Sequence, residues 1–246
     1  MQYVEFGAHN SQTIILLHGG GLSWWNYRAV AQLLSDRFHV VLPILDGHAD
    51  SDAPFTSIED NAARIIAHID EHFGGKVLAI CGLSLGGQIA VEMLTQRPDI
   101  CRFALLESTL VKPSKLTHAL IKPTFGMSYG LIKHKRFAKM QAAYLGIPKK
   151  LFNDYFRDTC KITKEDMIAF LQSNSAYSIK PALLNAQAKV HSVFGSKEQS
   201  SIRTSGKLLN RMIPDSTLES LPGYNHGDLS LNHPQAYAQI LLTLIS

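Results

Sequence analysis

The first half of the chain alternates between short, fully apolar runs and segments in which apolar residues recur at helical spacing. The apolar runs predict β-strands at 13–17, 38–42, 76–81 and 103–106. The helical patterns between them cover 25–34, 57–73 and 85–96. Strands that lack polar alternation are buried on both faces, so this order predicts a mostly parallel sheet flanked by helices.

This alternation stops between residues 110 and 186, where the pattern is mostly helical. Helices are expected at 115–140, with breaks at Pro123 and Gly126, and then at 148–158 and 163–177. Strand and helix signals resume after residue 187, at 190–194, 200–212, 217–221 and 234–244. We therefore predict an α/β fold with a core formed by residues 1–109 and 187–246, interrupted by a helical cap, or lid, at 110–186.

The bulk composition fits such a folded unit. Of the 246 residues, 46% are hydrophobic and 18% are charged, which provides a sizeable core and argues against disorder. The N-terminus lacks the pattern of a signal peptide, and no run of 18 apolar residues occurs, so stable membrane insertion is not expected. Cys81, Cys101 and Cys160 form no CxxC or Cys/His cluster. A reduced, cytoplasmic setting without a structural metal is the expectation.

Charge is concentrated in one part of the predicted cap. Residues 112–150 contain nine Lys or Arg and no acidic residue, whereas the whole chain carries a net charge of only +4. The simplest interpretation is the solvated face of a helical insertion, although a basic segment can also attract nucleic acid, acidic lipids or an anionic substrate. No nucleic-acid-binding motif accompanies it, so no nucleic-acid partner is expected. The sequence does not predict an oligomeric state.

A serine between glycines follows the third predicted strand. Gly82-Leu83-Ser84-Leu85-Gly86 matches the pattern G-x-S-x-G, with a strand leading in and a helix leading out. Such a turn brings backbone segments so close that a Cβ at the flanking glycines would clash, and it exposes the serine hydroxyl above the sheet. The positive N-terminal end of the next helix points to the same place. We predict that Ser84 is a catalytic nucleophile.

A serine nucleophile at neutral pH needs a general base. Of the eleven histidines, His226 lies in the loop Pro222–Gly227, between the last predicted strand and the last predicted helix. This placement fits the chain order serine, acid, histidine. His226 is therefore the predicted base.

An acid should hold the imidazole in one tautomer and stabilise its charged form. Glu198 follows the predicted strand 190–194 and is our first choice, the alternative being a surface acid that caps the next helix. Glu107, at the end of the strand 103–106, is the second candidate for the acid. Asp228 lies too close to His226 along the chain.

Backbone N–H groups must also meet the charge that develops on a carbonyl oxygen under attack. One donor is expected from Leu85, directly after the nucleophile. The other is expected from the loop His18-Gly19-Gly20-Gly21, with Gly20 preferred and Gly21 possible as the second choice. No G-K-[ST] or G-x-G-x-x-G pattern accompanies this loop, which argues against a phosphate cradle. His18 is expected to brace the loop by hydrogen bonding.

Together these motifs resemble the α/β-hydrolase superfamily, in particular single-domain serine hydrolases with a helical cap. The resemblance covers nearly the whole chain, through H-G-G-G at 18–21, G-L-S-L-G-G at 82–87, G-S-K-E at 195–198 and G-Y-N-H-G at 223–227. It implies hydrolysis of an ester, thioester, amide or related bond through an acyl-enzyme, without a cofactor. Relatives with an aspartate nucleophile are disfavoured because Ser84 occupies that position.

Three departures from the family pattern stand out. The acid position carries Glu198, where Asp is commoner, and the N-terminal antiparallel hairpin is shortened to residues 3–6. The loop 44–51 lacks the first Asp and the second Gly of the pattern D-x-x-G-x-G-x-S. His48, Asp50 and Asp52 in and beside this loop are interpreted as turn and capping residues and not as metal ligands.

The predicted substrate is a small molecule, the ester or thioester of a small to medium apolar acyl group. Trp24 and Trp25, just after the glycine loop, are candidates for the wall of the acyl pocket. The basic cap raises the hypothesis of an anionic or CoA-linked substrate. Two other functions stay open: lyase or C–C bond hydrolase chemistry with the same triad, and a non-catalytic small-molecule receptor.

Overall fold

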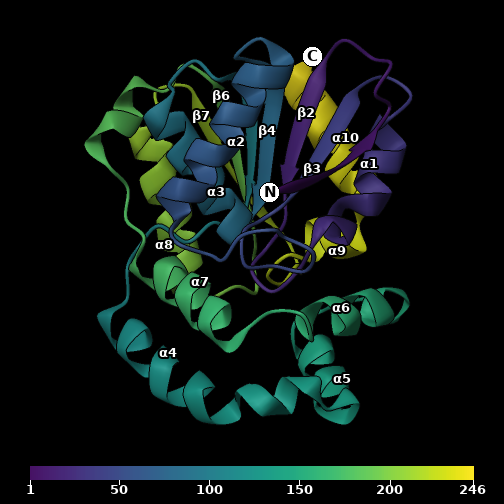
Figure 1. Cartoon of the computed structure of the whole chain (residues 1–246). Helices are drawn as coiled ribbons and strands as arrows, with labels where there is room; N and C mark the ends of the chain where they lie inside the picture. Colours follow the sequence, from purple (N-terminus) through teal and green to yellow (C-terminus); the bar gives the residue numbers. More distant parts are fainter.

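The computed structural model describes all 246 residues around a seven-stranded sheet (Figure 1). The strands lie in the order β1-β3-β2-β4-β5-β6-β7; only β1 runs antiparallel to its neighbour. Their bounds are β1 Gln2–Phe6, β2 Thr13–Leu17, β3 His39–Ile44, β4 Val77–Leu83, β5 Cys101–Glu107, β6 Lys189–Gly195 and β7 Ser216–Leu221. The predicted α/β fold with a mostly parallel sheet is confirmed.

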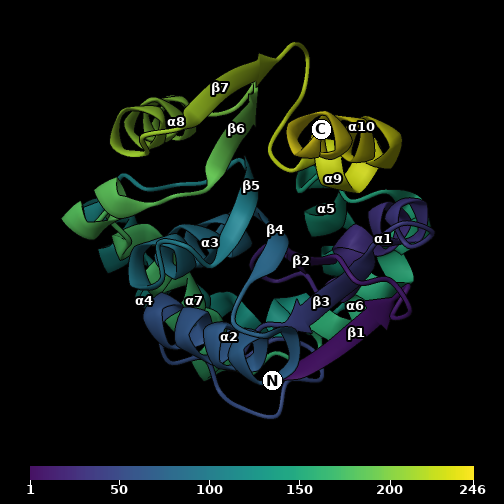
Figure 2. The same ribbon diagram turned by 90° about the horizontal axis from the view of Figure 1, so that it is seen from above.

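Helices cover both faces of the sheet, as the view from above shows (Figure 2). One face carries α2 (Ile58–Phe73), α3 (Leu85–Gln96) and α8 (Ser200–Met212), and the other carries α1 (Arg28–Leu34) and α10 (Pro234–Ile245). Side chains of β2 alternate between the two apolar cores: Ile15 and Leu17 pack into the first, Ile14 and Leu16 into the second. This division explains why the strand is apolar at every position.

Strand β3 extends further than the pattern predicts, because it passes through Pro43. Pro43 pairs with Tyr3 of β1, whereas the pairing of β3 with β2 ends at Val41. Proline lacks an N–H donor and is tolerated where one side of a strand needs none. The predicted strand 38–42 is therefore too short by two residues at its end, since Pro43 and Ile44 belong to β3.

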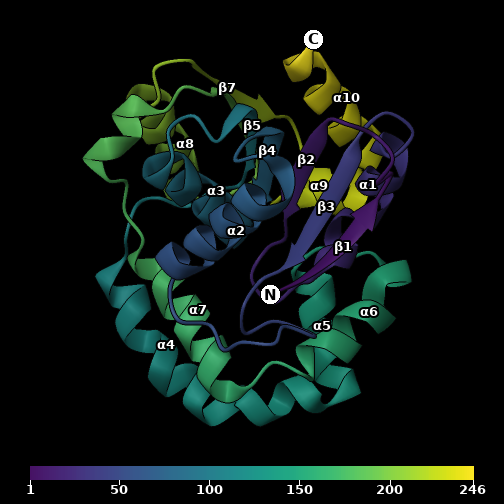
Figure 3. The same cartoon turned by 45° about the horizontal axis from the view of Figure 1, so that its top comes forward.

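Most helices of the segment between β5 and β6 gather beyond the carboxyl ends of the strands (Figures 1 and 3). They are α4 (Lys115–Ser128), α5 (Lys135–Tyr144), α6 (Phe152–Thr159) and α7 (Lys164–Ala176), with short 3-10 turns at 129–133, 149–151 and 181–185. The predicted breaks at Pro123 and Gly126 are wrong, since α4 continues through both. Pro123 lies on the exposed side, where water can replace the hydrogen bond that proline cannot make.

Helices α6 and α7 are tied to the sheet domain by buried polar contacts. The indole Nε1 of Trp25 donates to Asp158 of α6 at 2.9 Å, and the backbone N–H of Phe55 donates to Asp166 of α7 at 2.8 Å. Helices α4 and α5 lie outside this layer, at the end of the molecule farthest from the sheet (Figure 1). None of the helices is both long enough and apolar enough to cross a membrane.

Candidate active site

A cavity of about 200 Å³ lies between the carboxyl ends of the central strands and the helices that follow β5. The sheet side contributes backbone and side chains from the loop after β2, the end of β4 and the loop after β7. The opposite wall comes from the end of α5 and from α7. Its lining residues are Gly19, Gly20, Leu22, Leu83, Ser84, Leu85, Leu145, Ile147, Phe170, Leu171, Asn174, His226, Gly227 and Leu231. The wall is therefore mostly apolar, with Ser84, Asn174 and His226 as its polar side chains.

Ser84 sits in a strained backbone conformation at the turn between β4 and α3. Its φ is 52° and its ψ is −110°, a combination that non-glycine residues rarely adopt. The turn is closed so tightly that a Cβ at Gly82 would lie 2.3 Å from the carbonyl oxygen of Gly86, and a Cβ at Gly86 would lie 2.1 Å from that of Leu17. Both glycines are thus required sterically, and the turn presents Ser84 to the cavity.

His226 and Glu198 are joined directly. The distance from His226 Nδ1 to Glu198 Oε2 is 2.7 Å, while His226 remains half exposed and Glu198 is buried. Because the ionised carboxylate accepts, Nδ1 carries the proton, and Nε2 is left with a lone pair. No hydrogen bond joins Ser84 to His226 in this structure, but the two residues line the same cavity. Such contacts are often longer without substrate.

Ser108 supports Glu198 and was missed by the sequence reasoning. It follows β5 with a φ of 53°, and its hydroxyl donates to Glu198 Oε1 at 2.8 Å. The backbone N–H of Gly195 donates to the same oxygen at 2.7 Å. Glu198 therefore has both carboxylate oxygens engaged, which fixes the oxygen that faces His226. Neither the spacing nor the residue type of Ser108 predicts this role, because the role depends on β5 lying next to β6.

Glu107, the second candidate for the acid, is not bonded to His226. Its Oε1 accepts from the backbone N–H groups of Leu229 and Ser230 at 3.0 and 3.2 Å, at the start of the short helix α9 (Asp228–Asn232). Its Oε2 is buried without a partner. Burial raises the pKa of Glu107 from 4.5 to about 7, which favours the neutral acid. Glu107 thus holds the backbone that follows His226.

Two backbone N–H groups at the cavity are unused within the protein. Gly20 and Leu85 both line the cavity, and neither N–H takes part in a hydrogen bond. Gly21 does not belong to the lining. His18 braces this loop as predicted: its Nδ1 donates to the carbonyl oxygen of Gly19 at 2.9 Å, and its Nε2 accepts from Leu45 N–H at 3.1 Å. Burial lowers the pKa of His18 to about 3, so its ring stays neutral.

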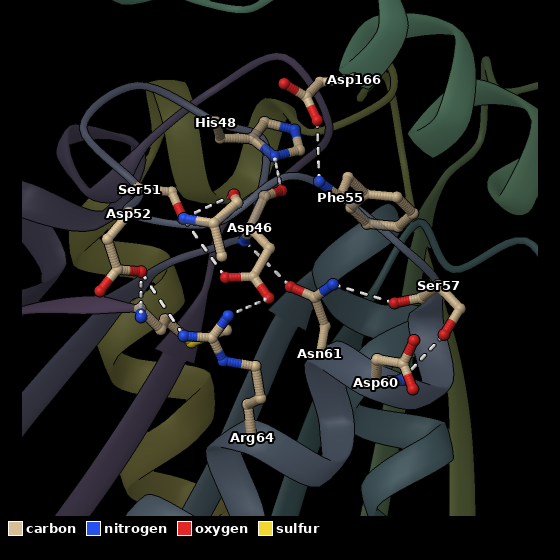
Figure 4. A network of polar contacts seen from close by, with 12 residues as sticks. Asp46, His48, Ser51, Asp52, Phe55, Ser57, Asp60, Asn61, Arg64 and Asp166 are labelled. Atoms are coloured by element: carbon tan, nitrogen blue, oxygen red, sulfur yellow. Dashed lines mark hydrogen bonds and ion pairs between the residues drawn. The ribbon is translucent and has the colours of Figure 1, made fainter.

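The loop after β3, whose sequence departs from the family pattern, is held by a polar network (Figure 4). Asp46 is its centre: its backbone N–H donates to Asn61 Oδ1 at 3.0 Å, and its carboxylate meets Arg64 at 3.0 Å and the Ser51 hydroxyl at 3.3 Å. Burial raises the pKa of Asp46, and Arg64 opposes that shift. The side chain of His48 bonds to the carbonyl oxygen of Asp46 at 2.9 Å.

The acidic neighbours in this loop have other partners. Asp50 pairs with Lys161, which precedes α7, and Asp52 pairs with Arg64. These contacts are those of turn and surface residues. The pair Asp50–Lys161 and the bond from the backbone N–H of Phe55 to Asp166 (Figure 4) attach the loop to the helices above it, whereas the pair Asp52–Arg64 attaches it to α2.

The prediction that Trp24 or Trp25 forms the acyl wall is not supported, since neither lines the cavity. Trp25 is buried and directed to Asp158, whereas the Trp24 ring packs under the guanidinium of Arg28 at 4.6 Å. Leu22, two residues earlier, occupies the wall in their place. The 3-10 turn Trp24–Tyr27 rotates the tryptophans away from the cavity toward α6 and α1.

Asn174 of α7 is a polar wall residue that sequence reasoning also missed. The side-chain NH₂ of the fully buried Gln88 donates to the carbonyl oxygens of Leu110 and Asn174 at 2.7 and 2.9 Å. Gln88 Oε1 must then accept from Asn174 Nδ2, at 2.9 Å. This chain of bonds leaves Asn174 Oδ1 as an acceptor without a protein partner. Gln88 ends the run Cys81–Gln88, but its reach across to α7 is visible only in three dimensions.

A model of the Alpha/beta hydrolase family matches residues 14–240 of the chain. An AB hydrolase superfamily protein from Gibberella zeae is 30% identical over 146 residues, which cover 57% of this chain and 50% of that protein. The chain spans about half the length, or less, of the first curated relatives that it matches.

Two further similarities extend over nearly the full length. A pimeloyl-[acyl-carrier protein] methyl ester esterase from Chromobacterium violaceum is 25% identical over 246 residues, which cover 93% of this chain and 92% of that protein. The crystal structure of the enol-lactonase from Burkholderia xenovorans superposes with a TM-score of 0.83 at 17% identity, covering 99% of this chain and 95% of that one. At this identity the structural likeness concerns the fold alone.

Proposed function

The chain belongs to the alpha/beta hydrolase family, and from that premise we propose that it is a serine hydrolase with the triad Ser84, His226 and Glu198. One observation carries the proposal: the strained Ser84 and the Glu198-bonded His226 line the same cavity. A nucleophile, a base in a fixed tautomer and a buried acid are the groups that acyl transfer requires.

In the proposed reaction, Ser84 Oγ attacks the carbonyl carbon of an ester or thioester while His226 Nε2 takes its proton. Glu198 stabilises the resulting imidazolium through Nδ1. The unused N–H groups of Gly20 and Leu85 donate to the developing oxyanion. His226 then returns the proton to the leaving alcohol or thiol. Water, deprotonated by His226, finally hydrolyses the acyl-enzyme and frees Ser84. Apart from substrate and water, these steps use only side chains and backbone groups of the protein.

We further propose that residues 110–186 act as the cap of this site, on a hydrolase core formed by residues 1–109 and 187–246. The proposal is supported by Ile147, Phe170 and Leu171, which close the cavity opposite Ser84. Excluding water from this side would strengthen the oxyanion contacts. The three cysteines are free, in keeping with the predicted cytoplasmic setting, which stays a prediction.

The size and lining of the cavity favour a small to medium acyl group. Its volume of about 200 Å³ lies below the roughly 300–1,000 Å³ that is usual for pockets holding drug-sized ligands. Leucine, isoleucine and phenylalanine dominate the wall, and no lysine or arginine belongs to it. The cavity itself therefore supports an apolar acyl group and gives no support to an anionic one. The relative from Chromobacterium violaceum is by name a methyl ester esterase, which agrees with ester chemistry.

The test combines covalent labelling with a series of esters. A fluorophosphonate probe should label the wild-type protein and fail to label Ser84→Ala, because only an activated serine reacts. Turnover of p-nitrophenyl esters should be highest for short acyl chains and decline once the chain exceeds the cavity. Labelling that survives in Ser84→Ala would refute the assignment of the nucleophile. Labelling without turnover of any ester would instead favour lyase or C–C bond chemistry, or a receptor.

A further inference from the structure

The outer helices of the cap expose an unusual number of large apolar side chains. Of the nine large hydrophobic residues that are exposed in the protein, seven lie between residues 116 and 145. They are Leu116, Leu120, Met127, Leu131, Met140, Tyr144 and Leu145, with exposed fractions from 43% to 92%. We refer to these seven residues as the outer cap face. Single exposed apolar residues need no explanation, but a cluster of this kind indicates an interaction surface.

The spacing places five of these residues in two helical stripes. Leu116, Leu120 and Met127 fall at positions i, i+4 and i+11 of α4, which a helix brings onto one side. Met140 and Tyr144 are likewise four residues apart on α5. Both helices lie at the end of the molecule farthest from the sheet, so one broad partner can reach both (Figures 1 and 3).

The cations of the basic segment lie on these two helices and on the turns beside them, with Lys115 and Lys122 on α4 and Lys135, Arg136 and Lys139 on α5. The nine Lys and Arg residues are Lys112, Lys115, Lys122, Lys133, Lys135, Arg136, Lys139, Lys149 and Lys150, and every one is exposed. None of them forms a salt bridge within the protein, whereas elsewhere cations such as Arg64, Arg97 and Lys180 do. No acidic residue interrupts the segment. Lys133 and Lys139 pack over the rings of Tyr129 and Phe152, but no acidic side chain of the protein neutralises any of the nine charges, so they are available to an anionic partner.

These two properties together restrict the partner. A second copy of the chain would bring nine further cations against the first nine, which disfavours self-association through this face. A neutral apolar partner would leave the nine positive charges without an opposite charge. Apolar stripes bordered by Lys and Arg on exposed helices are the pattern of helices that lie in the interface of an anionic bilayer.

The outer cap face also continues to the candidate active site. Leu145 belongs to this face and lines the cavity of Ser84, and Ile147 follows it into the wall. The turn after α5 is fixed by Asn232 Nδ2, which donates to the carbonyl oxygen of Gly146 at 3.0 Å. An ester leaving a lipid surface at this face would thus meet the cavity directly.

We propose that the outer cap face binds the surface of membranes that contain anionic lipid, peripherally and without spanning them. Binding goes beyond the proposed hydrolase activity and does not depend on it. Lysines near the surface would attract the anionic headgroups, and Leu116, Leu120 and Met127 would enter the headgroup region. Attraction between exposed charges is screened by salt, so binding should weaken as ionic strength rises.

The test is sedimentation of the wild-type protein with vesicles of phosphatidylcholine alone or with about one third phosphatidylglycerol. We expect binding to the anionic vesicles at 50 mM salt, at least tenfold weaker binding at 500 mM salt, and little binding to phosphatidylcholine. The variants Lys112→Gln/Lys115→Gln/Lys122→Gln and Leu116→Ser/Leu120→Ser/Met127→Ser should each reduce binding at least tenfold. All these side chains are exposed and lie outside the cavity, so the fold and the hydrolysis of soluble short esters should be unchanged.

Matched controls are available elsewhere on the surface. Leu33 and Leu184 are the two exposed large hydrophobic residues outside the outer cap face, and Lys189, Lys207 and Arg211 are exposed cations of the sheet domain. Leu33→Ser/Leu184→Ser and Lys189→Gln/Lys207→Gln/Arg211→Gln should bind vesicles as the wild type does. Absence of binding to anionic vesicles, equal binding to both lipids, or an equal loss in the controls would overturn the proposal. Binding to an acidic soluble protein without binding to vesicles would also overturn it. If the wild-type protein hydrolysed no ester, this result would contradict only the proposed function and not the binding to membranes.

Discussion

Two neighbouring strands, β5 and β6, each deliver a buried glutamate to the same end of the sheet, yet the two side chains have different partners. Glu198, in the loop after β6, bonds to the side chains of His226 and Ser108. Glu107, the last residue of β5, bonds to two backbone N–H groups of α9. Position at a strand end therefore does not define the acid of a triad. The partner distinguishes them: Glu198 faces the imidazole of His226, the general base that we propose, and Glu107 faces backbone N–H groups of α9.

The largest effect that separates the two glutamates is expected in turnover. Glu198→Gln replaces the acceptor at His226 Nδ1 by an amide that can also donate, which favours the wrong imidazole tautomer and no longer stabilises the imidazolium. We expect kcat for a short p-nitrophenyl ester to fall by about 10⁴-fold, as is typical when the acid of such a triad is changed to its amide. Glu107→Gln keeps an oxygen for the N–H groups of Leu229 and Ser230, so it should lower kcat less than tenfold.

Circular dichroism and denaturant unfolding of both variants serve as the control for folding. A loss of turnover at Glu107→Gln equal to or greater than that at Glu198→Gln would reverse the assignment of the acid. The same outcome would mean that Glu107, and not Glu198, supports His226 in the working enzyme.

The second difference concerns stability as a function of pH. Burial raises the pKa of Glu107 from 4.5 to about 7, so the folded protein binds a proton that the unfolded chain releases. The contribution of this proton to stability is complete below pH 4.5 and is lost as pH rises through 7. Glutamine at 107 resembles the neutral acid and does not titrate. Relative to the wild type, Glu107→Gln should therefore gain about 2–3 kcal/mol of unfolding free energy between pH 5 and pH 8.

Urea unfolding of both proteins at the two pH values measures this gain, and the difference between them removes the titration of other groups. Parallel pH profiles would show that Glu107 is ionised in the folded protein at neutral pH. Its role as a neutral acceptor for α9 would then be wrong.

How far the sequence predicts this site follows from the same comparison. Ser84, His226 and Glu198 stand in local patterns at strand ends, so their approach follows from a parallel sheet, where all such ends meet at one edge. The roles of Ser108, Gln88 and Asn174 depend on which strands and helices become neighbours, and no local pattern encodes that. Trp24 and Trp25 illustrate the limit, because a single turn of 3-10 helix decides which side chain enters the cavity.

The smallest effect is expected from Ser108, whose hydroxyl bonds to Glu198 and not to Glu107. Ser108→Ala removes the hydroxyl that donates to Glu198 Oε1 at 2.8 Å but keeps a Cβ at this strained position, so the backbone should be little changed. A hydrogen bond to a charged group contributes roughly 1.5–3 kcal/mol, and part of it is recovered by water or by the remaining bond from Gly195. We expect kcat to fall about tenfold, with KM nearly unchanged, since Ser108 does not line the cavity.

If Ser108 has a structural role alone, Ser108→Ala should lower the amount of folded protein and leave the pH profile of kcat unchanged. If Ser108 positions Glu198, the substitution acts through His226 and should alter that profile. The double variant Ser108→Ala/Glu198→Gln separates the two. If Ser108 acts by orienting the carboxylate, its removal should cost nothing further once Glu198 is an amide, because the interaction that it supports is already lost. An additional tenfold loss in the double variant would show that Ser108 contributes independently. The contrast between the two glutamates would then rest on the bond to His226 alone.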